Sequence, residues 1–235
     1  MSSCLSLKDY IIIAGIWITN QRHKIHIRFA AHVRRSNLSS ELFSYDQAWG
    51  PAQEISDLIR PYSQRVEICG SLRRRRQEIK DIDIVCQDTD RFGMITALSQ
   101  IAQFVHPTPQ KILFRYDDVP GEIYCVHSEQ EFEVMKLERT GDYAFTQAIA
   151  RNAIERGYLF RFSVDPGYYK IPMYGLYKLG GRYYDKHEVR HYYANDMRNA
   201  VAFKERDILW LLYGKWIEPS ERSWAGEDQN SILRE

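Results

Sequence analysis

The stretch Gly70–Val85, GSLRRRRQEIKDIDIV, decides the fold of this chain. In IKDIDIVC, residues 79–86, apolar and acidic residues alternate among β-branched side chains, which predicts a strand with one buried face and one polar face. Asp81 and Asp83 would then lie side by side on the polar face. A short alternating segment, RVEIC over residues 65–69, leads directly into Gly70 and predicts a second strand.

The glycine, the serine and the two acids are residue types that bind phosphate groups and divalent metal ions. A Gly-Ser pair at the end of a strand lets backbone N–H groups and a hydroxyl approach a phosphate, which a larger side chain at Gly70 would block. Mg²⁺ keeps few protein ligands, so two adjacent carboxylates can hold two such ions, and Mn²⁺ can substitute. A metal pair about 3.5–4 Å apart stabilises both oxygens of a phosphoryl transfer. A lone D-x-D is often only the solvent-exposed face of a strand. The prediction of a phosphate and metal site therefore depends on the glycine, the serine and the two acids occurring together.

Further elements are predicted on both sides of this stretch. Helical spacing runs from Ser44 to about Arg60, where Pro61 ends it. A helix is expected over residues 92–104, followed by strands over 111–116 and 122–126 around a turn at Pro120–Gly121.

The C-terminal part predicts helices with defined ends and a β region between them. Asp142 is a favourable N-cap for a helix that Gly157 would terminate. A Tyr-rich β region follows over 167–193, and a last helix over 203–213 would stop at Gly214.

Composition places the chain among globular proteins. It has 235 residues, 44% hydrophobic and 27% charged, which excludes disordered, fibrous and membrane-embedded classes and allows one large domain or two small ones. Residues 1–40 hold six Lys and Arg and one acid, so that segment carries a charge of about +5 and the remainder about −4. The negative charge of residues 41–235 argues against strong, sequence-independent binding to nucleic acid.

Cysteine spacing and apolar runs give no sign of export. Cys4, Cys69, Cys86 and Cys125 form no C-x-x-C pair, so neither a disulfide framework nor a zinc site is expected. The longest apolar run, Tyr10–Ile18, is too short to span a bilayer. We expect a monomer inside the cell, cytoplasmic or nucleoid-associated, with no membrane contact.

Gly70–Val85 resembles the nucleotidyltransferase palm of the family X DNA polymerases, the DNA polymerase beta group. The resemblance covers roughly residues 44–224 and continues through LERTGDYAFTQAIAR (137–151), YGLYK (174–178) and FKERDILWLLYGKWIEPSER (203–222). It implies an α/β (α+β) fold. The expected parts are a poorly specified N-terminal extension (1–42), a palm with a mixed β-sheet and flanking helices (43–136) and a smaller α+β thumb (137–235).

The resemblance implies a three-carboxylate metal site. Asp81 and Asp83 would each ligate two Mg²⁺ ions. The family's third carboxylate is normally Asp; here the best match is Glu122, with one extra residue before the T-G segment. Glu131 and Glu133 are alternatives for that position.

Nucleotide-binding residues are also implied by the resemblance. Ser71 and Arg74 would bind the β- and γ-phosphates, with Gly70 allowing the approach and Arg73 a further candidate among the four consecutive arginines.

The sugar and the base of the nucleotide would lie against the T-G segment. Thr140 and Gly141 match the turn under the incoming sugar, and Thr146 the residue that touches the base or template. Glu138 and Arg139 stand where the family often has two aromatics, which leaves sugar selection open.

The function that the resemblance implies is addition of a nucleoside monophosphate from a dNTP or NTP to a nucleic-acid 3′-hydroxyl with release of pyrophosphate. A DNA primer/template is the expected partner, in DNA repair or synthesis. Residues 1–42 show no lyase-like or helix-hairpin-helix pattern, so we expect no lyase activity and weak DNA affinity. The alternatives are a template-independent transferase, a transferase acting on RNA, small-molecule or protein hydroxyls, and a non-catalytic nucleotide- or nucleic-acid-binding module.

Overall fold

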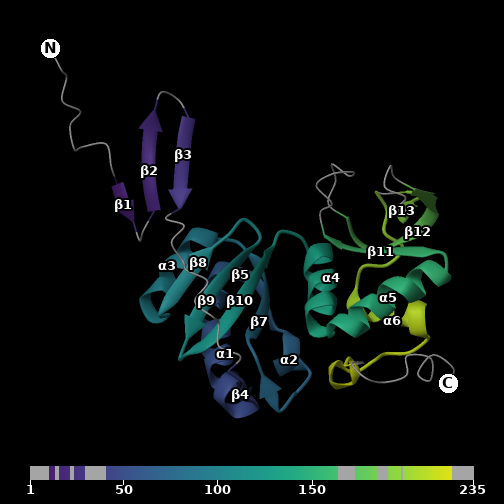
Figure 1. Cartoon of the computed structure of the whole chain (residues 1–235), viewed down its shortest axis with the longest axis horizontal. Coiled ribbons are helices and arrows are strands. Elements are labelled where there is room, and N and C mark those ends of the chain that lie inside the picture. Colours follow the sequence, from purple (N-terminus) through teal and green to yellow (C-terminus); the bar gives the residue numbers. More distant parts are fainter. Residues whose placement is uncertain are drawn as a thin grey trace. The chain divides into compact units, whose positions relative to one another are not determined.

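The computed structural model describes residues 11–13, 16–21, 24–29, 41–163, 173–184, 190–196 and 198–223. The chain divides into two compact units, Met1–Glu41 and Leu42–Glu235. The described part of the first unit is an antiparallel sheet of β1 (Ile11–Ile13), β2 (Ile16–Gln21) and β3 (Lys24–Phe29), in that order (Figure 1). The alternation in residues 24–29 fits the last of these strands.

A five-stranded mixed sheet forms the centre of the second unit, as the sequence predicted (Figure 1). Only β7 and β10 run parallel; the other neighbouring pairs are antiparallel. In spatial order the strands are β5 (Ser63–Ile68), β7 (Ile82–Asp88), β10 (Val119–Val126), β9 (Lys111–Tyr116) and β8 (Phe104–Pro107).

Two helices, α1 (Tyr45–Ile59) and α3 (Arg91–Ile101), cover one face of this sheet. Helix α1 begins with a capping box between Ser44 and Gln47, and the 3-10 turn Arg60–Tyr62 ends it at Pro61. The core under the helices is fully buried and includes Ile55, Ile84, Leu98 and Ile112. Burial of this apolar area is the main force that holds the layers together.

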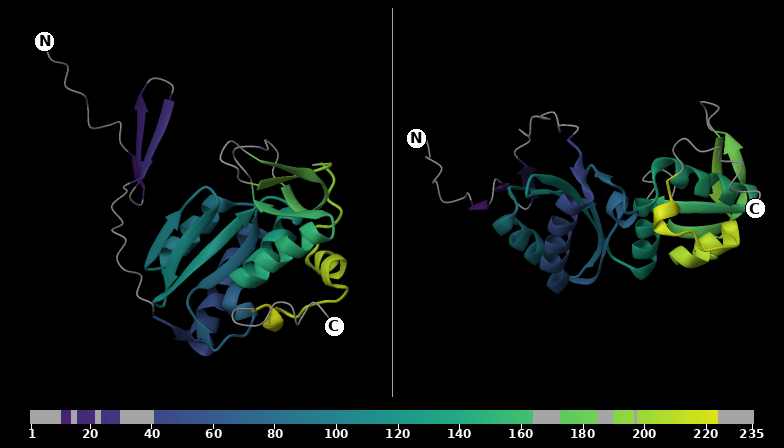
Figure 2. Two further views of the ribbon diagram at one scale, coloured as in Figure 1. Left: turned by 45° about the vertical axis from the view of Figure 1, so that its right-hand side comes forward. Right: turned by 90° about the horizontal axis from the view of Figure 1, so that it is seen from below.

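Helix α4 (Glu129–Thr140) lies on the other face and belongs to two cores (Figures 1 and 2). Its Phe132 packs with Val85 and Tyr124 of the sheet, whereas Val134 and Leu137 pack into the C-terminal core. The expected boundary between residues 136 and 137 therefore falls inside this helix.

The C-terminal part consists of helices packed on a small antiparallel sheet. Its core includes Phe145, Ile149, Leu176 and Ile208. The elements are α5 (Tyr143–Glu155), β11 (Tyr158–Ser163), β12 (Met173–Tyr184), β13 (Arg190–Ala194), α6 (Glu205–Tyr213) and the 3-10 turn Pro219–Glu221. Parts of the predicted Tyr-rich region, 167–172 and 185–189, lie outside the described residues.

The predicted helix ends in this part are confirmed. Asp142 accepts a hydrogen bond from the backbone N–H of Phe145 at 2.8 Å. Gly157 (φ 78°) and Gly214 (φ 70°) adopt the left-handed conformation that follows many helices.

The predicted turn at Pro120–Gly121 is wrong. Both residues belong to β10, and the hairpin turns at Asp117 and Asp118, with φ values of 50° and 63°. A two-residue hairpin of this hand needs positive φ at both positions, which Asp tolerates.

Three other segments differ from expectation. The helix expected over 92–104 stops at Ile101, and β8 follows it; helix α4 was not predicted. The strand expected over 79–86 is divided, because Glu78–Ile79 forms β6 and pairs with β4 (Phe43–Ser44) before β7 starts at Ile82.

Two expected properties can be compared with the described residues. Cys69, Cys86 and Cys125 are free and buried there. No helix among the described residues is long and apolar enough to cross a membrane.

Candidate active site

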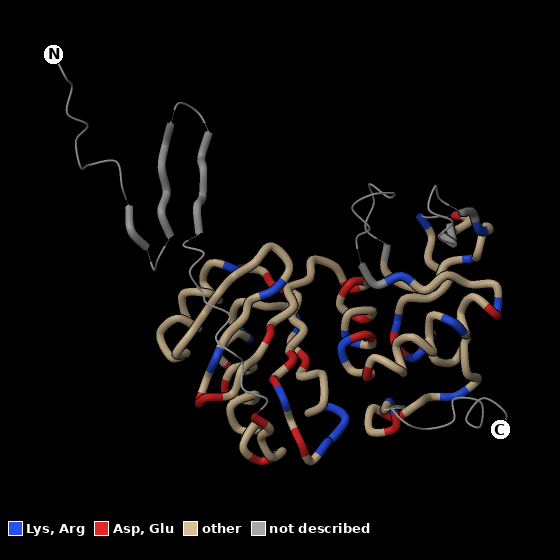
Figure 3. Tube along the Cα trace, in the orientation of Figure 1, with Lys and Arg blue, Asp and Glu red and all other residues tan. Residues whose placement is uncertain are grey.

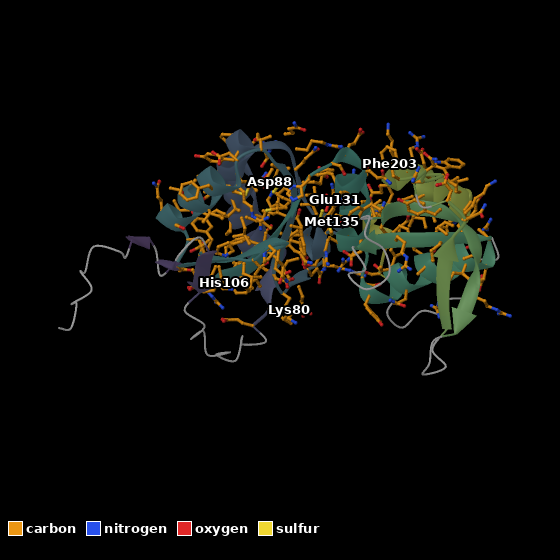
Figure 4. All side chains as sticks on the ribbon, turned by 90° about the horizontal axis from the view of Figure 1, so that it is seen from above. Lys80, Asp88, His106, Glu131, Met135 and Phe203 are labelled. Atoms are coloured by element: carbon orange, nitrogen blue, oxygen red, sulfur yellow. The ribbon has the colours of Figure 1, made fainter. Side chains whose placement is uncertain are left out.

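Strand pairing brings the predicted carboxylates to one face of the sheet. In the parallel pair of β7 and β10, Asp83 stands directly opposite Glu122. Ile82 and Ile84 point into the core under α1, so the intervening Asp83 faces the opposite side. Asp81 directly precedes β7, next to Lys80, which Figure 4 shows at the other end of this strand from Asp88.

A cavity of about 650 Å³ opens beside these acids. Six of the predicted residues line it: Ser71, Arg74, Asp81, Asp83, Gly141 and Thr146. Figure 3 shows the blue run of arginines after α2 (Gly70–Arg73) near the red acidic residues that lead into β7. The cavity therefore combines carboxylates and guanidinium groups, as a site for a metal ion and a phosphate requires.

The two aspartates carry more negative charge than their surroundings stabilise. Burial, and then the neighbouring Asp81, raise the pKa of Asp83 to about 8. Burial, and then the charge of Glu122, raise the pKa of Asp81. A divalent cation between the two carboxylates would remove this repulsion, so the donor set fits Mg²⁺.

Gly70 is required for a reason different from the one predicted. It has a φ of 61°, and a Cβ at this position would overlap Oδ2 of Asp83 and lie 2.9 Å from its Cγ. The backbone N–H of Cys69 donates to the carbonyl of Asp83 at 2.7 Å, which holds the two segments at this separation. The close neighbour of Gly70 in this structure is thus a carboxylate of the site.

Arg74 lines the cavity, and only part of the hydrogen-bonding capacity of its guanidinium is used. Its Nη1 donates to the carbonyl oxygen of Thr140 at 2.6 Å. Its buried Nε has no hydrogen-bond partner among the described residues. Burial lowers the pKa of Arg74, so an anion that approaches this partly desolvated guanidinium would stabilise its charge.

Glu122 shares the sheet face with Asp83 but is absent from the cavity wall. Lys111 Nζ lies 2.6 Å from Glu122 Oε1, and the Tyr124 hydroxyl donates to Oε2. Burial opposes ionisation of Glu122, but the hydrogen bonds from Lys111 and Tyr124 outweigh it, so its pKa is lowered. Within the described parts of the chain, no group of three or more His, Cys, Asp or Glu side chains converges to hold a metal ion.

The alternatives to Glu122 lie elsewhere. Glu131 accepts a hydrogen bond from the backbone N–H of His127 at 2.8 Å. Glu133 pairs with Arg65 at 2.6 Å and with Lys136 at 3.0 Å. Neither lines the cavity, whereas Glu122 is the register partner of Asp83. Glu122 therefore remains the predicted third carboxylate.

Comparison with known proteins identifies the architecture. No protein-family model and no curated protein matches the chain. Leishmania infantum polymerase beta in a ternary P/T complex is similar, with TM-score 0.57 and 18% identity over 77% of this chain and 77% of that one. The ternary gap complex of the same polymerase gives TM-score 0.58 and 17% identity over 79% of this chain and 71% of that one. The chain has a polymerase beta-like fold.

The fold matches the palm and thumb of polymerase beta; below, palm denotes the part that contains the five-stranded sheet, and thumb the C-terminal part that contains α5 and α6. A buried ion-pair network, here called the Glu205 cluster, joins them: Arg73, Lys136, Glu205 and Arg222. Arg73 donates to both oxygens of Glu205 at 2.8 and 2.9 Å. Burial opposes ionisation of Glu205, but Arg73 and Arg222 outweigh it and lower its pKa to about 2.

Two residues predicted as nucleotide ligands, Arg73 and Thr140, take part in this joint between palm and thumb. Arg73 does not line the cavity, since its guanidinium contacts Glu205 and the Thr140 hydroxyl, the latter at 2.7 Å. Thr140 is fully buried and also outside the cavity wall. The assignment of both side chains as nucleotide ligands stays a prediction, with their polar groups engaged in the joint in this structure.

Several residues near the site were not predicted from the sequence. Lys80 and Tyr143 line the cavity, as do Glu138 and Arg139, which the sequence had placed beside the sugar position. The Arg139 guanidinium lies 4.1 Å from the centre of the Tyr124 ring. Lys111 reaches Glu122 from the neighbouring strand β9, whereas Tyr124 lies two residues after Glu122 on β10; the only sequence signal for these contacts is the alternation of the two strands.

Proposed function

We propose that the chain is a metal-dependent nucleotidyltransferase that adds nucleoside monophosphates from dNTPs or NTPs to a nucleic-acid 3′-hydroxyl. The observation that carries this proposal is the pair Asp81 and Asp83 at the wall of a cavity that also contains Ser71 and Arg74. The polymerase beta-like fold supports the same class of reaction.

Asp81 and Asp83 would hold Mg²⁺, or Mn²⁺ in its place. The raised pKa of both aspartates supports this assignment, because the fold leaves a negative charge here that a bound cation would neutralise. When bound, the ions supply charge neutralisation at the phosphates and a lowered pKa for the attacking hydroxyl.

The protein's own groups would position the nucleotide. Arg74 offers an unpaired Nε–H and Ser71 a hydroxyl for the β- and γ-phosphates. Gly141 and Thr146 border the space left for the sugar and the base. The 3′-hydroxyl oxygen then forms a bond to the α-phosphorus while the bond to pyrophosphate breaks in line, so catalysis consists mainly of positioning and charge stabilisation.

A DNA primer/template is the acceptor we favour. The similar Leishmania structures are ternary P/T and gap complexes of a polymerase beta. The acidic charge balance outside residues 1–40 predicts weak binding to this acceptor, because few phosphates can be neutralised at once.

The decisive experiment is extension of a labelled 3′-end by the purified chain with Mg²⁺ or Mn²⁺. Substrates are templated DNA, single-stranded DNA and RNA, each with dNTPs and with NTPs. Asp81→Ala/Asp83→Ala should abolish extension, and Asp207→Asn, at an exposed thumb carboxylate, should retain it. Extension of single strands alone would identify a terminal transferase, and absence of extension with every substrate would contradict the proposal.

One observation favours a second candidate, a nucleotide-binding module without turnover. Glu122 lies outside the cavity wall and is engaged by Lys111 and Tyr124. A binding module of this kind would retain metal-dependent nucleotide binding and show no extension. Nucleotide titration of the wild-type chain beside the extension assay separates the two candidates.

A further inference from the structure

We propose that Lys111 is a positioning residue that competes with a metal ion for Glu122, so that the metal site acquires its third carboxylate only when the Lys111 ammonium is displaced. This inference rests on the proposed function above. It concerns the order in which the site is assembled, which the fold alone does not determine.

Strand register places the competing groups on one face of the palm. Glu122 is paired with Asp83 across β7 and β10, and Tyr124 is paired with Lys111 across β10 and β9. Residues two apart on a strand share a face, so Glu122 and Tyr124 point the same way. Lys111 therefore approaches Glu122 diagonally, with its Nζ 5.7 Å from the centre of the Tyr124 ring.

Both carboxylate oxygens of Glu122 are already engaged. Oε1 accepts from Lys111 Nζ at 2.6 Å, and Oε2 accepts from the Tyr124 hydroxyl. A divalent cation that binds Glu122 would bring like charge against the ammonium, at a cost that falls only if the lysine withdraws. Glu122 is absent from the cavity wall, as expected if Lys111 holds its carboxylate away from a metal ion there.

The ion pair between Lys111 and Glu122 is partly exposed, so its two side chains can separate. The side chains of Lys111 and Glu122 are 33% and 25% exposed, so water screens their attraction and can hydrate both groups after separation. By contrast, the Arg222 and Glu205 side chains in the Glu205 cluster are 0% and 4% exposed. The Lys111–Glu122 pair is thus a replaceable contact, whereas the pair in the Glu205 cluster is a fixed one.

This arrangement predicts sequential loading of two ions. The first ion binds Asp81 and Asp83, for which no ammonium contact has to be broken. The second ion requires Glu122 and therefore binds more weakly while Lys111 is present. Removal of the Lys111 charge should tighten the second site more than the first, because Lys111 contacts Glu122 directly and acts on Asp81 only through its charge.

The test is direct Mn²⁺ binding to the full chain, measured by the free-ion EPR signal in the presence of a non-hydrolysable nucleotide. In Lys111→Met, the weaker of two dissociation constants should fall about threefold to tenfold, the effect expected from loss of one partly exposed ion pair. Lys111→Gln, which keeps a donor without the charge, should show the same direction. Lys111→Arg should retain the wild-type value.

Lys80→Met is the matched control. Lys80 also lines the cavity and its charge acts on Asp81, but none of its hydrogen bonds or ion pairs in the described structure is to Glu122. If Lys80→Met tightened the weaker Mn²⁺ site as much as Lys111→Met does, the effect would come from overall charge, and the proposal would be overturned. The proposal would also be overturned if the weaker dissociation constant were unchanged in Lys111→Met and Lys111→Gln. Absence of any Mn²⁺ binding in the wild type would instead refute the proposed function together with this inference.

Discussion

Gly70 and Asp83 are so close that residue 70 has no space for a side chain: a Cβ there would overlap the carboxylate of Asp83. The contact joins the turn that would bind phosphate to the carboxylate that would bind metal. It links two parts of the proposed site, residues 70 and 83, that lie 13 residues apart in the chain.

Gly70→Ala should therefore damage both the fold and the metal site. The φ of 61° opposes any L side chain, and the added methyl group would displace Asp83. We expect a loss of about 2 kcal/mol or more in the free energy of unfolding and at least tenfold weaker Mn²⁺ binding. Gly157→Ala is the control, since it has a φ of 78° but nothing within 4 Å of a Cβ, and it should lose only about 1 kcal/mol with metal binding intact.

Asp83→Asn should stabilise the metal-free protein while it abolishes catalysis. The folded pKa of about 8 lies above the ordinary value of 3.8, so wild-type stability falls as the pH rises from about 4 to about 8, because a buried carboxylate must ionise. At pH 7 in EDTA, the variant should be roughly 2–4 kcal/mol more stable in urea unfolding. Mg²⁺ should stabilise the wild type and have little effect on the variant; the reverse pattern would contradict the assignment of Asp83.

Glu205→Gln should weaken the joint between palm and thumb in a pH-dependent way. Loss of the buried charge leaves Arg73 and Arg222 without their partner, at a cost of about 3 kcal/mol near neutral pH. The folded pKa is depressed to about 2, so this contribution is present above about pH 4.5 and disappears as the pH falls toward 2. Unfolding curves of both proteins should converge in that range, and a constant difference would exclude the mechanism.

Arg74→Ala should mainly lower activity and Arg73→Ala should mainly lower stability, although the two residues are adjacent. Arg74→Ala removes the guanidinium that faces the cavity and should lower kcat/KM for nucleotide about tenfold to a hundredfold, with a modest change in stability. Arg73→Ala should lower the unfolding midpoint in urea, because Glu205 loses a bidentate partner. Equal losses of stability in the two variants would refute this division of roles.

The sequence was informative where function depends on local spacing. The Gly70–Ser71 pair and the alternation that contains Asp83 are readable from neighbouring residues, and Ser71 and Asp83 both line the cavity, although β7 starts only at Ile82. The helix ends at Asp142 and Gly214 are equally local, because a cap involves residues within one turn.

Long-range partners account for most of what the sequence could not predict. Four consecutive arginines look alike in sequence, and Arg73 is distinguished only by Glu205, 132 positions away. Lys111 meets Glu122 through a strand register that no local pattern specifies. The turn was misplaced for a different reason: Pro and Gly are the commoner turn residues, whereas Asp117 and Asp118 supply the positive φ values here.

The four-residue helix α2 has a practical consequence for protein engineering. One of its ends holds Gly70 against Asp83, the carboxylate proposed to bind metal, and the other supplies Arg73 to the thumb. A thumb from another protein could not be exchanged into this chain as an independent module. A chimera would need an acidic residue at the position of Glu205; without one, the buried guanidinium of Arg73 would have no counter-ion next to the proposed nucleotide site.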